Sequence, residues 1–102
     1  MKGVHNMNRI LPIGSVVRIK DVKDPIMIFG YLQQTGLKPG VMVDYVGVPY
    51  PIGNINLQVQ LGFQMTAIEE VLFEGYRNDD FKHIELLLGL RLVQYISEGK
   101  LQ

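Results

Sequence analysis

The sequence predicts an α+β fold: a small, mainly antiparallel sheet of about four or five strands, curled or barrel-like, packed by one C-terminal helix. Short runs rich in β-branched and aromatic residues follow one another from residue 15 onward, separated by glycine, proline or polar residues. Residues 81–97 instead repeat apolar positions at helical spacing. Strands first and one helix last are typical of the α+β class, and the short turns favour antiparallel pairing.

Three segments carry the clearest strand signals. Residues 15–20 combine valine and isoleucine with basic residues that are expected to face water. Residues 26–32 are nearly all apolar, which predicts that both faces are covered, and Gly30 within them predicts a bulge or a close backbone approach. Residues 41–48 alternate between two faces and stop where prolines follow, because proline cannot donate to a ladder.

The segment that follows is less regular. Residues 56–61 alternate apolar and polar positions, which fits either a fourth strand or an ordered loop. Thr66 and Glu69 stand at capping-box spacing, which predicts one helical turn over residues 67–70. That turn is expected to lead into a last strand at residues 71–74.

The last element is predicted to be a helix over residues 81–97. Asn78 is suited to cap its start, Asp79 and Asp80 bring negative charge there, and Gly99 is its stop signal. Apolar residues on one side of this helix form an expected core stripe, namely Phe81, Ile84, Leu88, Leu92, Tyr95 and Ile96.

A second apolar ridge on the same helix predicts a protein interface. Leu86, Leu90 and Val93 stand four and three residues apart among polar residues, outside the core stripe. A small sheet can cover one side of a helix, so this ridge calls for a partner protein, a homodimer mate or an N-terminal arm. A groove in a curled sheet, or simple exposure, is the alternative. Tyr50, between two prolines, is expected to be displayed on a loop and is added to the interface.

Composition narrows the class of protein. With 102 residues there is room for one domain, which we place at residues 11–102 after a flexible lead-in at residues 1–10. The formal net charge of zero argues against nucleic-acid binding. No cysteine is present, the first residues lack the apolar core of a signal peptide, and no apolar run is long enough for a membrane span. These features predict a cytoplasmic protein.

No residue pattern predicts catalysis, a metal site or a cofactor. His83 lies near Asp79 and Asp80, but no nucleophile stands at a defined spacing, so a solvated histidine is favoured. The acidic residues near the last strand are explained by helix capping, and the glycines form no phosphate-binding loop. The chain is therefore predicted not to be an enzyme.

Aromatic residues could stack nucleic-acid bases on a sheet, but few basic residues accompany them. We therefore expect Tyr45 and Phe73 to pack in the core. The complete aromatic set considered is Tyr45, Tyr50, Phe63, Phe73 and Tyr76.

Three segments, taken in order, carry a family resemblance. They are LPIGSVV at residues 11–17, DYVGVPYPIG at residues 44–53 and EVLFEGY at residues 70–76. The chain thereby resembles a small domain family of unknown function from Gram-positive bacteria, numbered 4176. None of these motifs is chemical, so their specificity lies in their co-occurrence. Residues 56–63 match no part of the pattern. We hypothesise that this stretch determines which partner is bound.

The resemblance implies a biological setting. Members of this family are commonly encoded beside LXG-type toxins of the type VIIb secretion system. The resemblance therefore implies a non-enzymatic chaperone or adaptor that binds such a toxin, or another protein from the same locus, and targets it for secretion. Two alternatives remain, an immunity protein and a small ligand- or nucleic-acid-binding domain. The resemblance transfers no catalytic residue.

Overall fold

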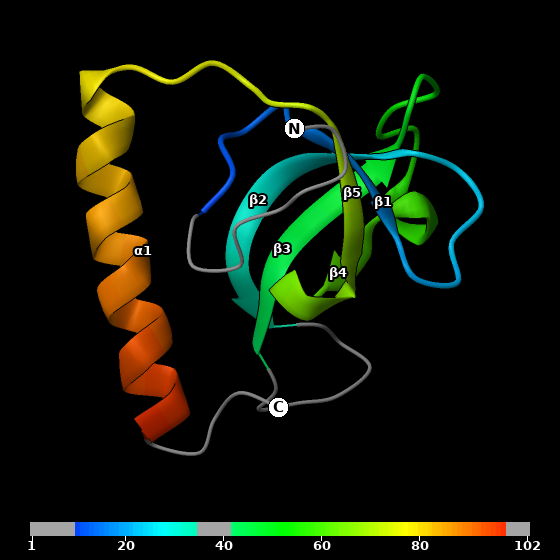
Figure 1. Cartoon of the computed structure of the whole chain (residues 1–102). Coiled ribbons are helices and arrows are strands. Elements are labelled where there is room, and N and C mark those ends of the chain that lie inside the picture. Colours follow the sequence, from blue (N-terminus) through cyan, green and yellow to red (C-terminus); the bar gives the residue numbers. More distant parts are fainter. Residues whose placement is uncertain (1–9, 35–41, 98–102) are drawn as a thin grey trace.

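The computed structural model describes residues 10–34 and 42–97; the side chains of residues 32–34 and 90–97 lie outside this description. Five strands form one antiparallel sheet, and one helix stands beside it (Figure 1). The elements are β1 (Val16–Ile19), β2 (Ile26–Gln34), β3 (Met42–Pro49), η1 (Leu57–Val59), β4 (Leu61–Phe63), η2 (Met65–Ala67), β5 (Ile68–Phe73) and α1 (Asp79–Ser97), where η marks a 3₁₀ turn. The predicted α+β class is confirmed.

The strand order is β4-β3-β2-β1-β5, and every neighbouring pair is antiparallel. Strands β1 to β4 therefore form a meander, and β5 returns to pair with β1. The sheet is curved but open, because β4 and β5 are its two edges (Figure 1). This return places the third motif segment beside the first, although they are far apart in the sequence.

The three clearest strand predictions are confirmed, with small shifts of their ends. The bulge predicted at Gly30 is also present. Ile28 pairs with Gly47, and the next paired residue of β2 is Gly30, opposite Val46, so one residue of β2 is left over. A bulge of this kind bends the strand that contains it.

Of the two interpretations left open for residues 56–61, the ordered loop is right up to Gln60: Leu57 begins η1 and is 78% exposed, and β4 starts only at Leu61. One local prediction is wrong. The helical turn predicted over residues 67–70 lies earlier, in η2. Ile68 is buried and pairs with Ile19 of β1, so strand pairing outweighs the capping-box signal.

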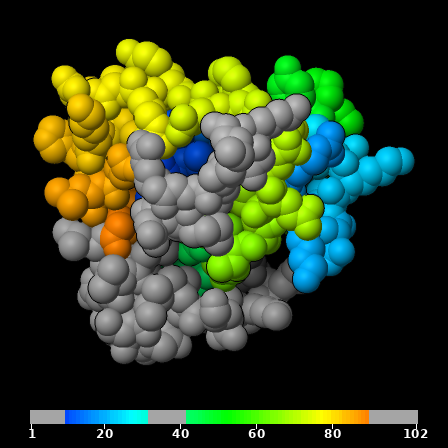
Figure 2. Space-filling view, viewed as in Figure 1, coloured from blue at the N-terminus to red at the C-terminus, as the bar shows by residue number. Residues whose placement is uncertain are grey.

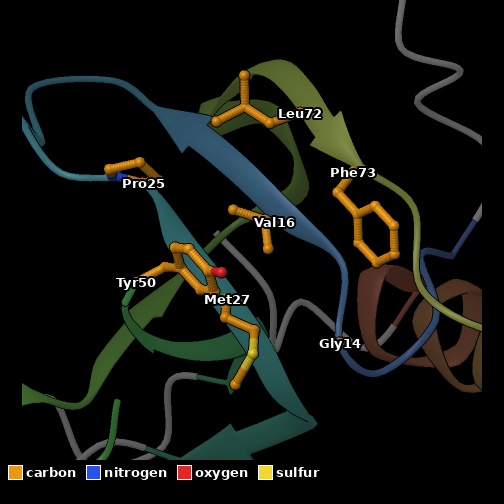
Figure 3. A pocket seen from close by; sticks show the side chains of 7 residues that line it. All are labelled: Gly14, Val16, Pro25, Met27, Tyr50, Leu72 and Phe73. Carbon is orange, nitrogen blue, oxygen red and sulfur yellow. The ribbon is translucent and has the colours of Figure 1, made fainter. Parts of the chain in front are cut away.

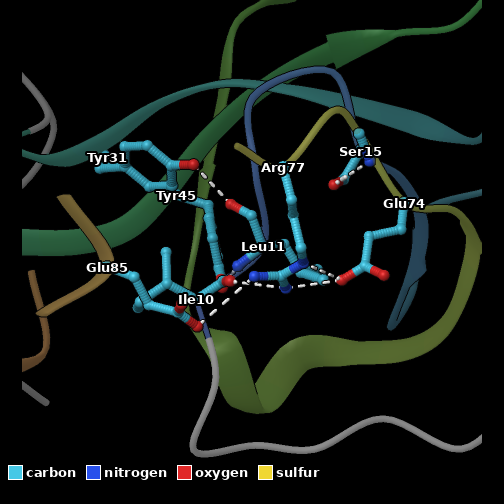
Figure 4. A network of polar contacts seen from close by, with 9 residues as sticks. Ile10, Leu11, Ser15, Tyr31, Tyr45, Glu74, Arg77 and Glu85 are labelled. Carbon is cyan, nitrogen blue, oxygen red and sulfur yellow. Dashed lines mark hydrogen bonds and ion pairs between the residues drawn. The ribbon is translucent and has the colours of Figure 1, made fainter. Parts of the chain in front are cut away.

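The core lies on the inner face of the sheet. The buried cluster draws on every strand and on η2, and its members are Ile10, Leu11, Val17, Ile19, Ile26, Ile28, Tyr45, Phe63, Met65 and Ile68. Ile10, the last residue of the predicted lead-in, is thus part of the core; residues 1–9 lie outside the described residues. Buried Leu11 and Pro12 continue the chain from Ile10, between α1 and the sheet (Figures 1 and 4).

The helix begins as predicted, and its described side chains, at residues 79–89, are covered on one side. The backbone N–H of Phe81 donates to Asn78 Oδ1 over 2.8 Å, the N-cap interaction expected from the sequence. Phe81 and Leu88 pack against the core cluster. Ile84 was predicted to join them, yet it is 45% exposed, because the narrow segment at residues 10–12 meets the helix in place of a broad sheet face. The stop signal at Gly99 lies outside the described residues.

Candidate interaction surfaces

The residues that carry the family resemblance mainly hold the fold together. Ser15 is fully buried, and its Oγ accepts a hydrogen bond from the backbone N–H of Gly75 over 2.9 Å. A Cβ at Gly75 would overlap the carbonyl oxygen of Ile13, so only glycine fits there. The first and third motif segments are therefore joined directly, and these residues are structural.

Two tyrosines hold the first motif segment in place, Tyr45 from the middle motif segment and Tyr31 from β2 (Figure 4). The Tyr45 hydroxyl accepts a hydrogen bond from the Leu11 backbone N–H over 3.1 Å, and the Tyr31 hydroxyl donates to the Leu11 carbonyl over 2.5 Å. Burial raises the pKa of Tyr45 to about 12, and burial together with the neighbouring Tyr45 also raises the pKa of Tyr31. Both hydroxyls therefore stay protonated at neutral pH and act as structural hydrogen-bonding groups.

Asp44 ties β3 to η2. Its Oδ2 accepts a hydrogen bond from the backbone N–H of Met65 over 2.6 Å, and its own backbone N–H donates to Gln64 Oε1 over 3.1 Å. Burial raises the pKa of Asp44, and the bond from Met65 opposes that rise. The Asp44 carboxylate thus has a structural role.

Arg77 lies in the segment between β5 and α1, residues 74–78, and joins this segment to both the helix and the core (Figure 4). Its guanidinium lies 2.6 Å from Glu74 and 3.5 Å from Glu85 of α1, and it stacks over the Phe81 ring at 5.1 Å. It also donates to the Ile10 carbonyl over 3.3 Å. These contacts hold the first part of α1 against the sheet.

The face of the sheet away from the core carries an apolar hollow of 580 Å³. Val16 pairs with Met27 of β2 and with Phe73 of β5, so the three side chains meet across neighbouring strands. In Figure 3 the rings of Tyr50 and Phe73 flank Val16, with Leu72 and Met27 at either end. We call this the outer hollow; its residues are Gly14, Val16, Pro25, Met27, Tyr50, Leu72 and Phe73.

A protruding loop adjoins the outer hollow. Residues 50–60 contain no charged residue, and we call them the charge-free loop. Its apolar side chains point into solvent: Ile52 is 61% exposed, Ile55 64% and Leu57 78%. The loop is anchored where the Tyr50 N–H donates to the Pro25 carbonyl over 2.9 Å. It projects beyond the sheet at the upper right of Figures 1 and 2, next to the β1–β2 turn.

The predicted interface residues lie on separate surfaces. Leu86 is on α1 and is 63% exposed, whereas Tyr50 is 52% exposed and lines the outer hollow, away from the helix. Leu90 and Val93 fall within α1, but their side chains are outside the described ones. Neighbouring Leu87 is 58% exposed. The interface at these residues therefore stays a prediction.

Sequence reasoning missed the outer hollow, because it assigned Phe73 to the core. Phe73 is 61% exposed, and that prediction is wrong. The prediction for Tyr45, with no exposed surface, is right. The alternation of residues along β1 shows which of its side chains point away from the core. The contact of Met27 and Phe73 with Val16 depends on strand order and register, which the sequence does not reveal.

The chemical candidates are dispersed. His83 is exposed on α1, Glu74 pairs with Arg77, and Asp79 lies 3.7 Å from Lys82. Within residues 10–34 and 42–97, no three histidine, aspartate or glutamate side chains gather so that they could hold a metal ion. The notable features of the described surface are therefore apolar rather than catalytic.

A protein-family model matches residues 10–84, and its description is Domain of unknown function (DUF4176). The chain belongs to this family. The match spans all five strands, the outer hollow and the charge-free loop, and it ends within α1, before Leu86. No curated protein and no solved structure matches the chain. Among the described residues, no helix has the length and apolar character needed to cross a bilayer.

Proposed function

We propose that this chain is a non-enzymatic chaperone or adaptor that binds an LXG-type toxin in the cytoplasm and targets it to the type VIIb secretion system. The observation that carries the binding role is the one-sided packing of α1. Phe81 and Leu88 face the core, while Leu86 and Leu87 stay 63% and 58% exposed. The identity of the client follows from the family resemblance of the motif segments.

The energy available from this surface suits a protein partner. Burying a leucine side chain contributes roughly 1.5–3 kcal/mol, so two or three such residues supply much of a micromolar affinity. An amphipathic helix of the client could lay its own apolar stripe against this ridge.

Co-expression with an LXG-type toxin encoded beside this protein tests the proposal. Size-exclusion chromatography with mass determination should show one complex that contains both chains. The Leu86→Glu variant, alone and with Leu90→Glu, should lose the complex and keep its thermal midpoint. His83→Glu is the matched control, because it adds the same carboxylate to an exposed position of the same helix and should still bind.

Three outcomes would count against the proposal. Separate elution of the two wild-type proteins would contradict binding. Equal binding by Leu86→Glu and His83→Glu would place the interface away from the ridge. Protection of cells that express only the toxin's catalytic domain would indicate an immunity protein instead.

A further inference from the structure

We propose that two copies of this chain pair through their outer faces, each placing its charge-free loop in the outer hollow of the other. This pairing goes beyond the proposed function and does not depend on it, because it involves the outer face of the sheet rather than the apolar ridge of α1. The hollow, the loop and their relative placement are separate observations that support it.

The hollow has the size and chemistry of a binding site. Its volume of 580 Å³ falls in the range of about 300–1,000 Å³ that is typical of ligand pockets. None of its seven residues is charged, and the Tyr50 hydroxyl is its only polar side-chain group. Such a site favours aliphatic side chains over a charged or strongly polar ligand.

The loop offers such side chains on a preformed support. Asn56 Oδ1 accepts a hydrogen bond from the Val59 N–H over 3.2 Å, and Gln60 Nε2 donates to Asn54 Oδ1 over 3.2 Å. These bonds satisfy the loop internally and leave its apolar side chains directed outward. A loop that is already ordered loses less conformational entropy on binding.

The placement of the two features is self-complementary. Tyr50 belongs to both, since it begins the loop and lines the hollow. In a twofold pair, the patch on one copy meets the same patch on the other. A loop that lies beside a hollow can therefore form two equivalent contacts, with each loop in the hollow of the other copy. This geometry is the reason for choosing a second copy over an unrelated protein as the occupant.

Charge and area agree with that choice. No charged residue occurs in the charge-free loop or among the residues of the outer hollow, and depletion of charge marks the centre of protein interfaces. Lys20, Asp21, Lys23 and Asp24 in the adjacent turn mix both signs and suit a polar rim. At roughly 100 Å² of exposed area each, Tyr50, Leu72, Phe73 and the three apolar loop residues offer about 600 Å². A standard interface buries about 800 Å² per partner, so a modest dimer is expected.

Mass determination on the full chain across a concentration series is the test. The wild type should shift from 11.6 kDa to twice that mass, with a dissociation constant on the order of micromolar. Leu57→Asp in the loop and Phe73→Asp in the hollow should each weaken pairing at least about 100-fold. Leu86→Asp, at a position of similar exposure on α1, should pair like the wild type.

A mixing experiment tests the exchange itself. An equimolar mixture of the Leu57→Asp and Phe73→Asp variants contains intact hollows on one protein and intact loops on the other. It should therefore form a mixed dimer more tightly than either variant alone. Any of three results would overturn the proposal: a wild type that stays monomeric, a Leu86→Asp variant that pairs as weakly as Leu57→Asp and Phe73→Asp, or a mixture that pairs no more tightly than either variant alone. Thermal unfolding of every variant shows that the fold is retained.

Discussion

Replacing Tyr45 by phenylalanine isolates one buried hydrogen bond. Tyr45 has no exposed surface, and its hydroxyl accepts from the Leu11 N–H over 3.1 Å. The ring contacts with Phe63 and Tyr31, at centroid distances of 5.6 and 5.9 Å, do not involve the hydroxyl and should persist. The variant thus leaves a buried N–H without its acceptor, which costs about 1–3 kcal/mol.

The free energy of unfolding measured in urea should fall by about 2 kcal/mol, and the thermal midpoint by about 10 °C. Tyr76→Phe is the matched control: Tyr76 is 80% exposed, and removing its hydroxyl should change stability by less than about 0.5 kcal/mol. A Tyr45→Phe variant as stable as the control would refute the structural role assigned to the buried hydroxyl, and with it the way Leu11 is seated between the helix and the sheet.

Three further changes test other parts of the fold. Gly75→Ala places a Cβ against the Ile13 carbonyl and should destabilise the fold by about 1–3 kcal/mol or more. Gly89→Ala, in α1 at a position with open space around the added Cβ, should stabilise the fold by about 0.5–1 kcal/mol. Urea unfolding measures both changes, and equal effects would contradict the close packing at Gly75. Because burial raises the pKa of Asp44, its folded form keeps the proton to higher pH than its unfolded form. The stability it contributes is complete below the ordinary pKa of 3.8 and is lost as pH rises through the raised pKa. Asp44→Asn cannot titrate, so the stability of the wild type relative to this variant should fall with rising pH in urea unfolding; a rise would show that the bond from Met65 dominates instead.

The elements that the sequence predicted well are those in which local pattern and tertiary environment agree. The strand at residues 26–32 is flanked by clear turn signals and forms where expected, with the predicted bulge at Gly30. The prediction that both its faces are covered is wrong, because Met27 is only half-buried and lines the outer hollow. The cap at Asn78 is a local interaction of a side chain with a nearby backbone N–H, so it is readable without knowledge of the rest of the chain.

The failures come from non-local pairing. Thr66 and Glu69 have capping-box spacing, but Ile68 finds a partner on β1, and the sequence does not show that β5 returns there. Ile84 has the spacing of a core residue, yet the narrow segment at residues 10–12 is what meets the helix. In both cases a remote segment decides the outcome.

The candidate surfaces were predictable only in part. Exposure of Tyr50 and Leu86 follows from proline neighbours and from helical periodicity. The outer hollow does not, because it needs Val16, Met27 and Phe73 to meet across three strands. Strand order and register determine this contact, and neither can be predicted from the local residue pattern.

Calorimetric titration of the purified full chain with the LXG-type toxin encoded beside it tests the proposed function most directly. We expect saturable binding with a micromolar or lower dissociation constant and a negative heat-capacity change from apolar burial. Binding by Leu86→Glu should be at least about tenfold weaker. Absence of binding at about 100 μM, or equal affinity of the wild type and Leu86→Glu, would contradict it.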